Sequence, residues 1–246
     1  MESYGAFAHR YDAMMHDVDY DAWVAYLESF LQERQAKTVL DCACGTGRIG
    51  IALCRHGYTV TGSDRSADML FEARSNALKA GCRTMPFIQQ DLTAIALHQP
   101  IDAIVCACDG VNYLTRLSEV RAFFMHAKDA LSSGGLLLFD VSSPYKFSQV
   151  LGDRTFTEET DDYAYIWRNA YDPHNQLCEM LLTWFEREGD RYRRCFERHL
   201  QRAHTRTELL TLLSETGFSD AACYGAFTRT DPKPDDERLQ FVAIKP

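Results

Sequence analysis

Short apolar segments alternate with helical segments over residues 38–141, and this alternation constrains the fold more than any other feature of the chain. Five segments have the composition of buried strands: residues 37–42, 59–64, 86–91, 101–108 and 136–141. Between them lie helical patterns at residues 48–56, after a capping Ser66, and from Ser118, while residues 132–135 have the composition of a turn. Residues 21–32 predict one more amphipathic helix. The alternation predicts a doubly wound, mostly parallel sheet with right-handed crossovers.

The pattern changes after the fifth predicted strand. Residues 155–203 lack helical spacing and contain turn signals at 172–175 and 188–190, which predict an antiparallel meander of about three strands. A capping box of Thr205 and Glu208 then begins a helix. Strands at about 218–227 and 238–245 follow, and as an antiparallel pair they would complete a sheet of seven strands. We therefore expect one α/β domain from residues 1–149 and 204–246, with residues 150–203 as a β insertion.

Charge and cysteine usage exclude several classes of protein. The formal net charge of −9 gives no overall basic field for nucleic acid or anionic lipid. The nine cysteines are scattered without a CxxC pair, so we expect free thiols in a reducing compartment and no metal site. No apolar run reaches the length of about 18 residues that crosses a membrane, and the N-terminus lacks the apolar region of a signal peptide. A cytoplasmic location is expected.

A glycine-rich segment follows the first predicted strand. Gly45, Gly47 and Gly50 match the pattern G-x-G-x-x-G between a strand and a helix, and Asp64 ends the next strand, as in a dinucleotide site. Asp41 precedes this loop, where a pyrophosphate would be repelled but a cationic amino-acid group would be attracted. Asp91 ends the third strand. The three carboxylates therefore fall at strand ends, where open α/β sheets bind ligands.

The segment from Val39 to Gly47 resembles the first motif of class I S-adenosylmethionine-dependent methyltransferases. The resemblance continues through residues 60–64, 66–70 and 90–92 and ends at residues 134–140. The N-terminal residues 11–23 and the segment 109–114 are similar to the small-molecule branch of that family, which includes sugar-amine N-methyltransferases and uncharacterised bacterial proteins. One departure is the presence of cysteine at both 42 and 44.

The resemblance implies the cofactor and the roles of named residues. S-adenosylmethionine would be bound by Tyr11, Tyr20, Trp23, Asp41, Ala43, Gly45, Gly47, Asp64, Arg65, Met69, Asp91, Leu92 and Asp109. In this assignment Asp64 takes the ribose hydroxyls, Asp91 with the Leu92 backbone takes the adenine, and the N-terminal aromatic residues close over the cofactor. Asn112, Tyr113 and Tyr145 are candidates for contact with the methyl acceptor. Methyl transfer needs position and a dry site more than one residue type, so the catalytic residues stay unknown from sequence.

The acceptor is open at this stage. A small molecule methylated at nitrogen or oxygen is the first hypothesis. An RNA or protein acceptor is the second, because seven arginines lie between residues 187 and 206, interleaved with Tyr192 and Phe196. A non-catalytic protein that binds a nucleotide or NAD is the third. His199 and His204 in the same segment could be acceptor-site bases or packed side chains. No membrane partner is expected, and the oligomeric state is unknown.

Overall fold

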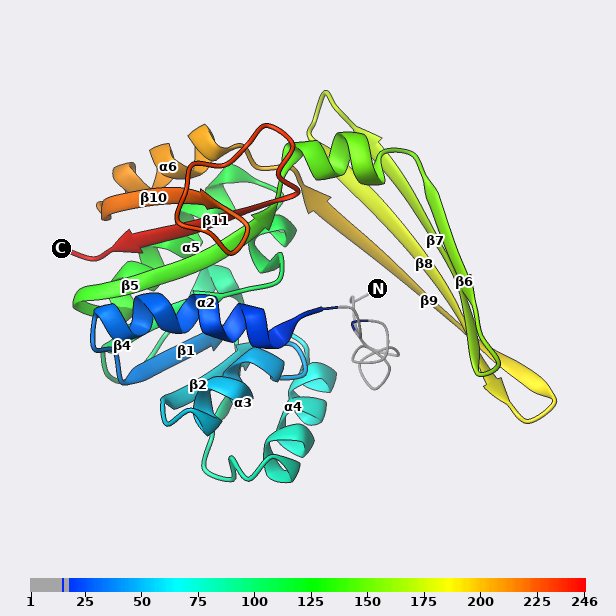
Figure 1. The fold of residues 1–246 in the computed structure, drawn as a ribbon, viewed down its shortest axis with the longest axis horizontal. Coiled ribbons are helices and arrows are strands. Elements are labelled where there is room, and N and C mark those ends of the chain that lie inside the picture. Colours follow the sequence, from blue (N-terminus) through cyan, green and yellow to red (C-terminus); the bar gives the residue numbers. More distant parts are fainter. Residues whose placement is uncertain (1–14, 16–17) are drawn as a thin grey trace.

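A computed structural model describes residue 15 and residues 18–246 of the chain. Within that part, seven strands form one sheet in the order β10–β11–β5–β4–β1–β2–β3 (Figure 1). These strands are β1 (Thr38–Cys42), β2 (Thr59–Asp64), β3 (Phe87–Gln89), β4 (Ile101–Cys106), β5 (Leu131–Ser142), β10 (Ser219–Gly225) and β11 (Arg238–Ile244). The first five strands run parallel, and β11 runs antiparallel to both β5 and β10. The predicted doubly wound sheet and its terminal antiparallel pair are confirmed.

The helices cover both faces of this sheet. They are α2 (Tyr20–Glu33), α3 (Arg48–Arg55), α4 (Ala67–Lys79), α5 (Leu117–Ala130) and α6 (Arg206–Glu215), with short helices η1 (Leu92–Ala94), η2 (Gly110–Tyr113) and η3 (Lys146–Leu151). Buried side chains of α2, α3 and α4 pack together with one set of strand residues, and those of α5 and α6 pack with another. The sheet is therefore the middle of three layers.

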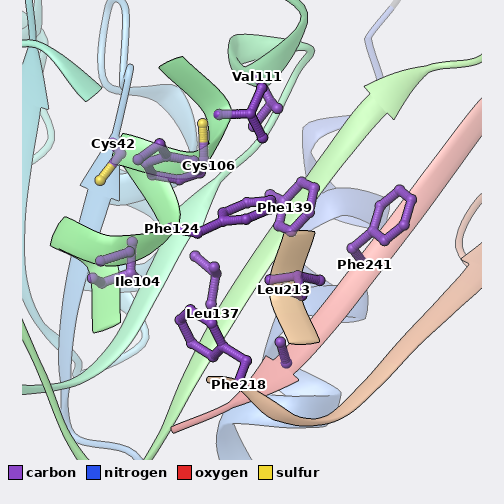
Figure 2. Close-up of a cluster of buried hydrophobic side chains, with 14 of the residues drawn as sticks. Cys42, Ile104, Cys106, Val111, Phe124, Leu137, Phe139, Leu213, Phe218 and Phe241 are labelled. Atoms are coloured by element: carbon purple, nitrogen blue, oxygen red, sulfur yellow. The ribbon is translucent and has the colours of Figure 1, made fainter. Parts of the chain in front are cut away.

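Alternate residues of each central strand point to opposite layers. Val39, Ala103 and Leu138 belong to the cluster under α2 and α3, whereas their neighbours Leu40, Ile104 and Leu137 belong to the cluster under α5 and α6. Figure 2 shows the second cluster, in which the rings of Phe139 and Phe241 stack with centroids 4.8 Å apart. The predominance of apolar residues in the central part of these strands follows from burial on both faces.

A second sheet lies within the predicted insertion. It is antiparallel in the order β6–β7–β8–β9, with β6 (Thr155–Glu159), β7 (Tyr163–Asp172), β8 (Leu177–Glu188) and β9 (Arg191–Arg202), and it extends away from the main sheet (Figure 1). The prediction of about three strands is wrong, because the described chain forms four. Thr160 closes the missed β6–β7 turn by donating its backbone N–H to the Tyr163 carbonyl at 2.8 Å. Asp161 and Asp162 fill that turn without the glycine or proline that marks the turns at 172–175 and 188–190.

Three predicted element boundaries are also corrected. The fourth strand stops at Cys106 because Cys108 and Asp109 have positive φ angles of 59° and 68°. The helix expected from Ser118 begins at Leu117, where Glu119 accepts the backbone N–H of Arg116 at 3.0 Å. Residues 132–135 belong to β5 rather than to a turn, because the backbone of Gly134 and Gly135 pairs with Lys245 near the end of β11.

Candidate functional site

A cavity of about 990 Å³, open mouth included, lies at the carboxyl ends of β1, β2 and β4. This edge of an open α/β sheet is where ligands bind. The cavity brings together ten of the residues that the sequence predicted: Tyr20, Asp41, Ala43, Gly45, Asp64, Arg65, Met69, Asp91, Leu92 and Tyr113. Five others do not line it: Trp23, Gly47, Asp109, Asn112 and Tyr145. Tyr11 lies outside the described residues.

The glycine loop makes a tight turn from β1 into α3. Gly45 and Gly47 have φ angles of 53° and 82°, and Gly47 is the N-terminal cap of α3. A Cβ atom at Gly47 would lie 3.1 Å from Cδ1 of Ile51 and would also occupy a left-handed conformation that side chains rarely adopt. Gly47 thus shapes the loop although it does not line the cavity. The loop places the N-terminus of α3, with its partial positive charge, at the wall of the cavity.

Asp64 fixes the loop from the neighbouring strand. Its Oδ2 accepts the backbone N–H of Gly45 at 2.9 Å, and its Oδ1 accepts the backbone N–H of Ser66 at 2.8 Å. Burial raises the pKa of Asp64 above its ordinary value, while these two N–H groups and Arg65 act in the opposite direction. Each carboxylate oxygen has a second lone pair, so the side chain can still accept hydrogen bonds from a ligand in the cavity.

Asp41 lies deeper at the end of β1. The residue is 2 % exposed, and its Oδ2 accepts the backbone N–H of Gly50 at 2.9 Å. Burial raises the pKa of Asp41 to about 7; the Gly50 hydrogen bond opposes this rise and the Asp64 charge adds to it. A buried carboxylate at the cavity wall favours a ligand that brings a positive charge.

Another part of the cavity lining combines one carboxylate with apolar side chains. Asp91 begins η1 by accepting the backbone N–H of Thr93 at 2.8 Å. Met69, Leu92 and Leu114 also line the cavity. The arrangement can hold a flat apolar ring that has a polar edge. Elsewhere in the lining, the guanidinium of Arg48 lies 5.1 Å from the ring centre of Tyr20.

Asp109 and Trp23 belong to a buried charged cluster beside the cavity. Arg238 donates to Oδ1 of Asp109 at 2.5 Å, also donates to Asp140, and lies over the Trp23 ring at 5.3 Å from its centre. Burial acts to raise the pKa of Asp109, but the charges of Arg238 and Lys146, together with hydrogen bonds from Arg238 and Ser142, lower that pKa below its ordinary value. Burial raises the pKa of Asp140 despite the same arginine. Trp23 is 4 % exposed and meets Phe227 edge to face, so this side chain is packed in the core.

The three predicted acceptor contacts occupy different environments. Asn112 is fully buried and joins the two ends of the insertion: its amide donates to the carbonyls of Ser142 and Arg202 at 3.2 and 2.8 Å and accepts the Ser142 N–H at 2.9 Å. Tyr145 is half-buried at the start of η3. Tyr113 alone of the three lines the cavity, and its hydroxyl lies 3.1 Å from Nδ1 of His199 on β9.

Sequence reasoning missed nine lining residues. They are Cys44, Thr46, Arg48, Ile49, Gln90, Ala107, Cys108, Gly110 and Leu114. All of them lie next to residues that were predicted, in the glycine loop or directly after a strand. Their place in the loops could have predicted them, because a loop that turns around a ligand exposes consecutive residues to that ligand.

His204, a candidate base from the sequence, does not line the cavity. It is fully buried, with Nε2 at 2.9 Å from the Leu114 carbonyl, and burial lowers its pKa to about 4.

The part of the chain that the structure describes contains neither a membrane-spanning helix nor a cluster of metal ligands. No helix in that part of the chain is both long and apolar enough to cross a membrane. No group of three or more His, Cys, Asp or Glu side chains there is arranged to hold a metal ion. All nine cysteines have free thiols in the structure.

Comparison with known proteins identifies the family. Residues 39–135 match the methyltransferase domain family. The chain is 37 % identical over 250 residues to a protein of Geobacillus sp. (strain WCH70) that is named as a methyltransferase without a stated acceptor. This match covers 99 % of the present chain and 100 % of the Geobacillus protein. A crystal structure of an S-adenosylmethionine-dependent methyltransferase from Clostridium acetobutylicum has a TM-score of 0.86 and 28 % identity, covering 98 % of each chain. An aminopentose methyltransferase from Micromonospora echinaspora, with bound S-adenosylmethionine, shares the fold at a TM-score of 0.78 and 19 % identity over 100 % of this chain and 99 % of that one.

The lining of the cavity fits the cofactor of this family. S-adenosylmethionine carries an ammonium group, two ribose hydroxyls and a purine ring. The carboxylates of Asp41, Asp64 and Asp91 are acceptors for such donors, and the side chains of Met69 and Leu92 are apolar surfaces for a ring. The fold, the family match and the chemistry of the cavity agree: the chain belongs to the class I S-adenosylmethionine-dependent methyltransferases.

Proposed function

We propose that the protein transfers the methyl group of S-adenosylmethionine to a nitrogen or oxygen atom of a small-molecule acceptor. The observation that carries this proposal is the convergence of Asp41, Asp64 and Asp91 on one cavity beside Tyr113, which reaches the insertion. Structural relatives that act on small molecules, such as the aminopentose methyltransferase, support a small acceptor.

The proposed cofactor contacts follow from the placement of these side chains. Asp64 accepts the ribose hydroxyls, Asp91 and the Leu92 backbone face the adenine, and Asp41 supports the loop that passes the methionine end. Ala43, Arg65 and Met69 line the same cavity. Gly45 and Gly47 provide the positive φ angles that let the loop approach the cofactor closely. Asp109 does not line the cavity, and we assign it an indirect role in cofactor binding through its ion pair with Arg238.

The acceptor would approach from the side of the insertion. Residues 150–203 leave the main sheet after β5, at the edge where the cavity opens, and return through β9. We assign cofactor binding to residues 1–149 and 204–246, and a cover over the acceptor to the insertion. The face of the second sheet that carries His199 also carries aromatic side chains, including Trp184 stacked on Tyr163 with ring centres 4.4 Å apart. Such a face can exclude water from the reacting groups.

The arginines of the insertion favour a small molecule over RNA. In the insertion, Arg193 pairs with Glu186, Arg198 with Glu179 and Arg202 with Glu208. Directly after it, Arg206 of α6 pairs with Asp231, and all four N–O distances lie between 2.5 and 3.0 Å. These four ion pairs cancel much of the positive charge that phosphate groups would need. The acidic net charge of −9 acts in the same direction.

The chain contributes position and exclusion of water to the reaction. S-adenosylmethionine, when bound, supplies a methyl group already activated on a sulfonium. The cofactor is held at the strand ends by Asp41, Asp64 and Asp91. The acceptor then has to be placed only on the side of the cofactor that carries the methyl group. Holding two reactants in line accounts for much of the rate of such a displacement.

Calorimetry with S-adenosylhomocysteine and NAD tests the cofactor assignment. We expect S-adenosylhomocysteine to bind and NAD not to bind; the reverse result would overturn the assignment. The acceptor is then tested with a panel of amino sugars, small amines, phenols and alcohols, with S-adenosylhomocysteine formation as the readout. Binding of RNA with a steep salt dependence, abolished by Arg191→Ala and Arg194→Ala, would favour an RNA acceptor instead.

A further inference from the structure

Tyr113 joins the wall of the cavity to the insertion. It ends η2, which follows the carboxyl end of β4, and its side chain is part of the cavity lining. Its hydroxyl lies 3.1 Å from Nδ1 of His199, and the two rings meet edge to face with centres 6.0 Å apart. A cavity-lining hydroxyl is thus in direct contact with an imidazole of the second sheet.

Glu197 lies on the other side of the same imidazole. Glu197 and His199 are two residues apart on β9, so both side chains point to one face of the sheet. Oε2 of Glu197 lies 3.2 Å from Nε2 of His199. The exposed fractions of Glu197 and His199 are 5 % and 8 %, so bulk water competes little for either group.

The carboxylate determines which imidazole nitrogen carries the proton. A carboxylate accepts hydrogen bonds, so its contact with Nε2 favours the His199 tautomer that carries the proton on Nε2. Nδ1 then presents its lone pair to the Tyr113 hydroxyl. The order hydroxyl, imidazole, carboxylate is the arrangement by which proteins draw a proton from a hydroxyl group.

We propose that Tyr113, His199 and Glu197 form the proton relay of the methyl transfer. Tyr113 is the catalytic residue, because its side chain lines the cavity in which the acceptor would meet the cofactor. His199 and Glu197 are positioning residues that act through it. This inference rests on the proposed function and narrows it: the acceptor is a group with a proton to lose, either a hydroxyl or an amine that arrives as its ammonium form.

The proton and electron balance is complete within these groups. The acceptor O–H or N–H proton passes to Oη of Tyr113 as the phenolic proton passes to Nδ1 of His199. The electron pair left on the acceptor forms its bond to the methyl carbon, and the pair of the broken carbon–sulfur bond stays on sulfur. His199 ends as an imidazolium next to Glu197, and its extra proton leaves to water after the product departs.

The other candidate bases near the cavity are already engaged. His204 is turned to the Leu114 carbonyl and does not line the cavity. Asp91 begins η1 through Thr93, and Asp109 pairs with Arg238 behind the wall. Within the described lining, Tyr113 is the side chain whose hydroxyl is bonded to an imidazole.

The first test is spectroscopic and needs no acceptor. The ¹⁵N spectrum of the imidazoles is recorded on the whole protein with bound S-adenosylhomocysteine, and His199 is assigned from the signal lost in His199→Gln. We expect the tautomer with the proton on Nε2. Tyr113→Phe should shift the Nδ1 resonance of His199, whereas His174→Gln, in the exposed β7–β8 turn, should leave it unchanged. A proton on Nδ1, or no shift in Tyr113→Phe, overturns the proposal.

The second test is kinetic and uses the acceptor with the fastest turnover in the panel. Tyr113→Phe and His199→Gln should each lower kcat about 100-fold, while KM and the S-adenosylhomocysteine Kd change less than about threefold. The double variant should be no slower than the slower single variant, because the two residues act as one unit. His174→Gln should retain full activity. Losses that multiply in the double variant, or that appear in KM alone, contradict the relay. If no acceptor in the panel reacts, the proposed function fails, and the imidazole spectrum still decides whether the relay exists.

Discussion

Oδ2 of Asp41 accepts the backbone N–H of Gly50 at 2.9 Å, which joins the end of β1 to the first turn of α3. A Cβ atom at position 50 would lie 2.7 Å from the same oxygen. The contact therefore requires glycine and keeps the carboxylate away from water. Because this group lines the cavity, its protonation connects the stability of the fold with the cofactor site.

Asp41 should make the protein less stable as the pH rises. Its folded pKa is raised to about 7, whereas an unfolded aspartate titrates near about 3.9. The native state thus binds the proton more tightly, and the resulting stability is present below about pH 4 and lost as the pH rises to about 7. The free energy of unfolding of the wild type, relative to Asp41→Asn, should fall by up to about 1.4 kcal/mol per pH unit in this window. Urea denaturation of both proteins measures it. Asp140, whose pKa burial also raises, is present in both proteins, so its titration cancels when their free energies of unfolding are subtracted. A difference in free energy that does not change with pH would contradict the raised pKa of Asp41.

Asp64→Ala should weaken S-adenosylhomocysteine binding by about 2–4 kcal/mol, or roughly 30- to 1,000-fold in Kd, because charge-assisted hydrogen bonds to the ribose are lost. The variant also loses the acceptor for Gly45 and Ser66, so its unfolding is measured beside its binding. Asp68→Ala, in the exposed first turn of α4, is the matched control and should bind normally. An unchanged Kd for Asp64→Ala at full folding would remove Asp64 from the cofactor site.

Most of the fold could be predicted because its signals are local. Buried strands such as Ile101–Cys106 are apolar at every position except Asp102, and Ser66 and Thr205 cap the helices expected after them. The missed turn at Thr160 is closed by backbone groups and by the Thr160 hydroxyl, which donates to the Tyr163 carbonyl at 3.2 Å and accepts the Tyr163 N–H at 3.1 Å. The left-handed Cys108 has no side-chain signal. No glycine or proline marks residues 160–163 or residue 108 in the sequence.

The candidate site was predictable where it follows strand ends and hidden where it depends on long-range contacts. Asp41, Asp64 and Asp91 were found from their place after strands. The contact between Tyr113 and His199 joins residues 86 positions apart, and no periodicity could have paired them. Trp23 was expected over the cofactor, but its edge-to-face contact with Phe227, far along the chain, keeps it in the core.

Asn112→Ala should destabilise the protein by about 1–3 kcal/mol, because it leaves buried backbone groups of Ser142 and Arg202 without their partner. The loss should also loosen the insertion, which hydrogen exchange of the β9 amides would report as faster exchange. Asn175→Ala, in the exposed turn between β7 and β8, is the control and should change stability by less than about 0.5 kcal/mol. Equal stability of the two variants would show that Asn112 does not hold the insertion in place.

Replacement of residues 153–202 by a short Gly/Ser linker should abolish methyl transfer and preserve cofactor binding. All the cavity-lining residues of the described chain lie between Tyr20 and Leu114, outside the removed segment. We therefore expect the S-adenosylhomocysteine Kd to stay within about tenfold, or roughly 1.4 kcal/mol. Loss of Tyr113's contact with His199, and of the cover over the acceptor, would stop turnover. Circular dichroism and thermal unfolding establish that the shortened protein is folded. In a folded variant, a collapse of cofactor affinity would place the insertion in the cofactor site, and retained turnover would show that the acceptor needs no cover.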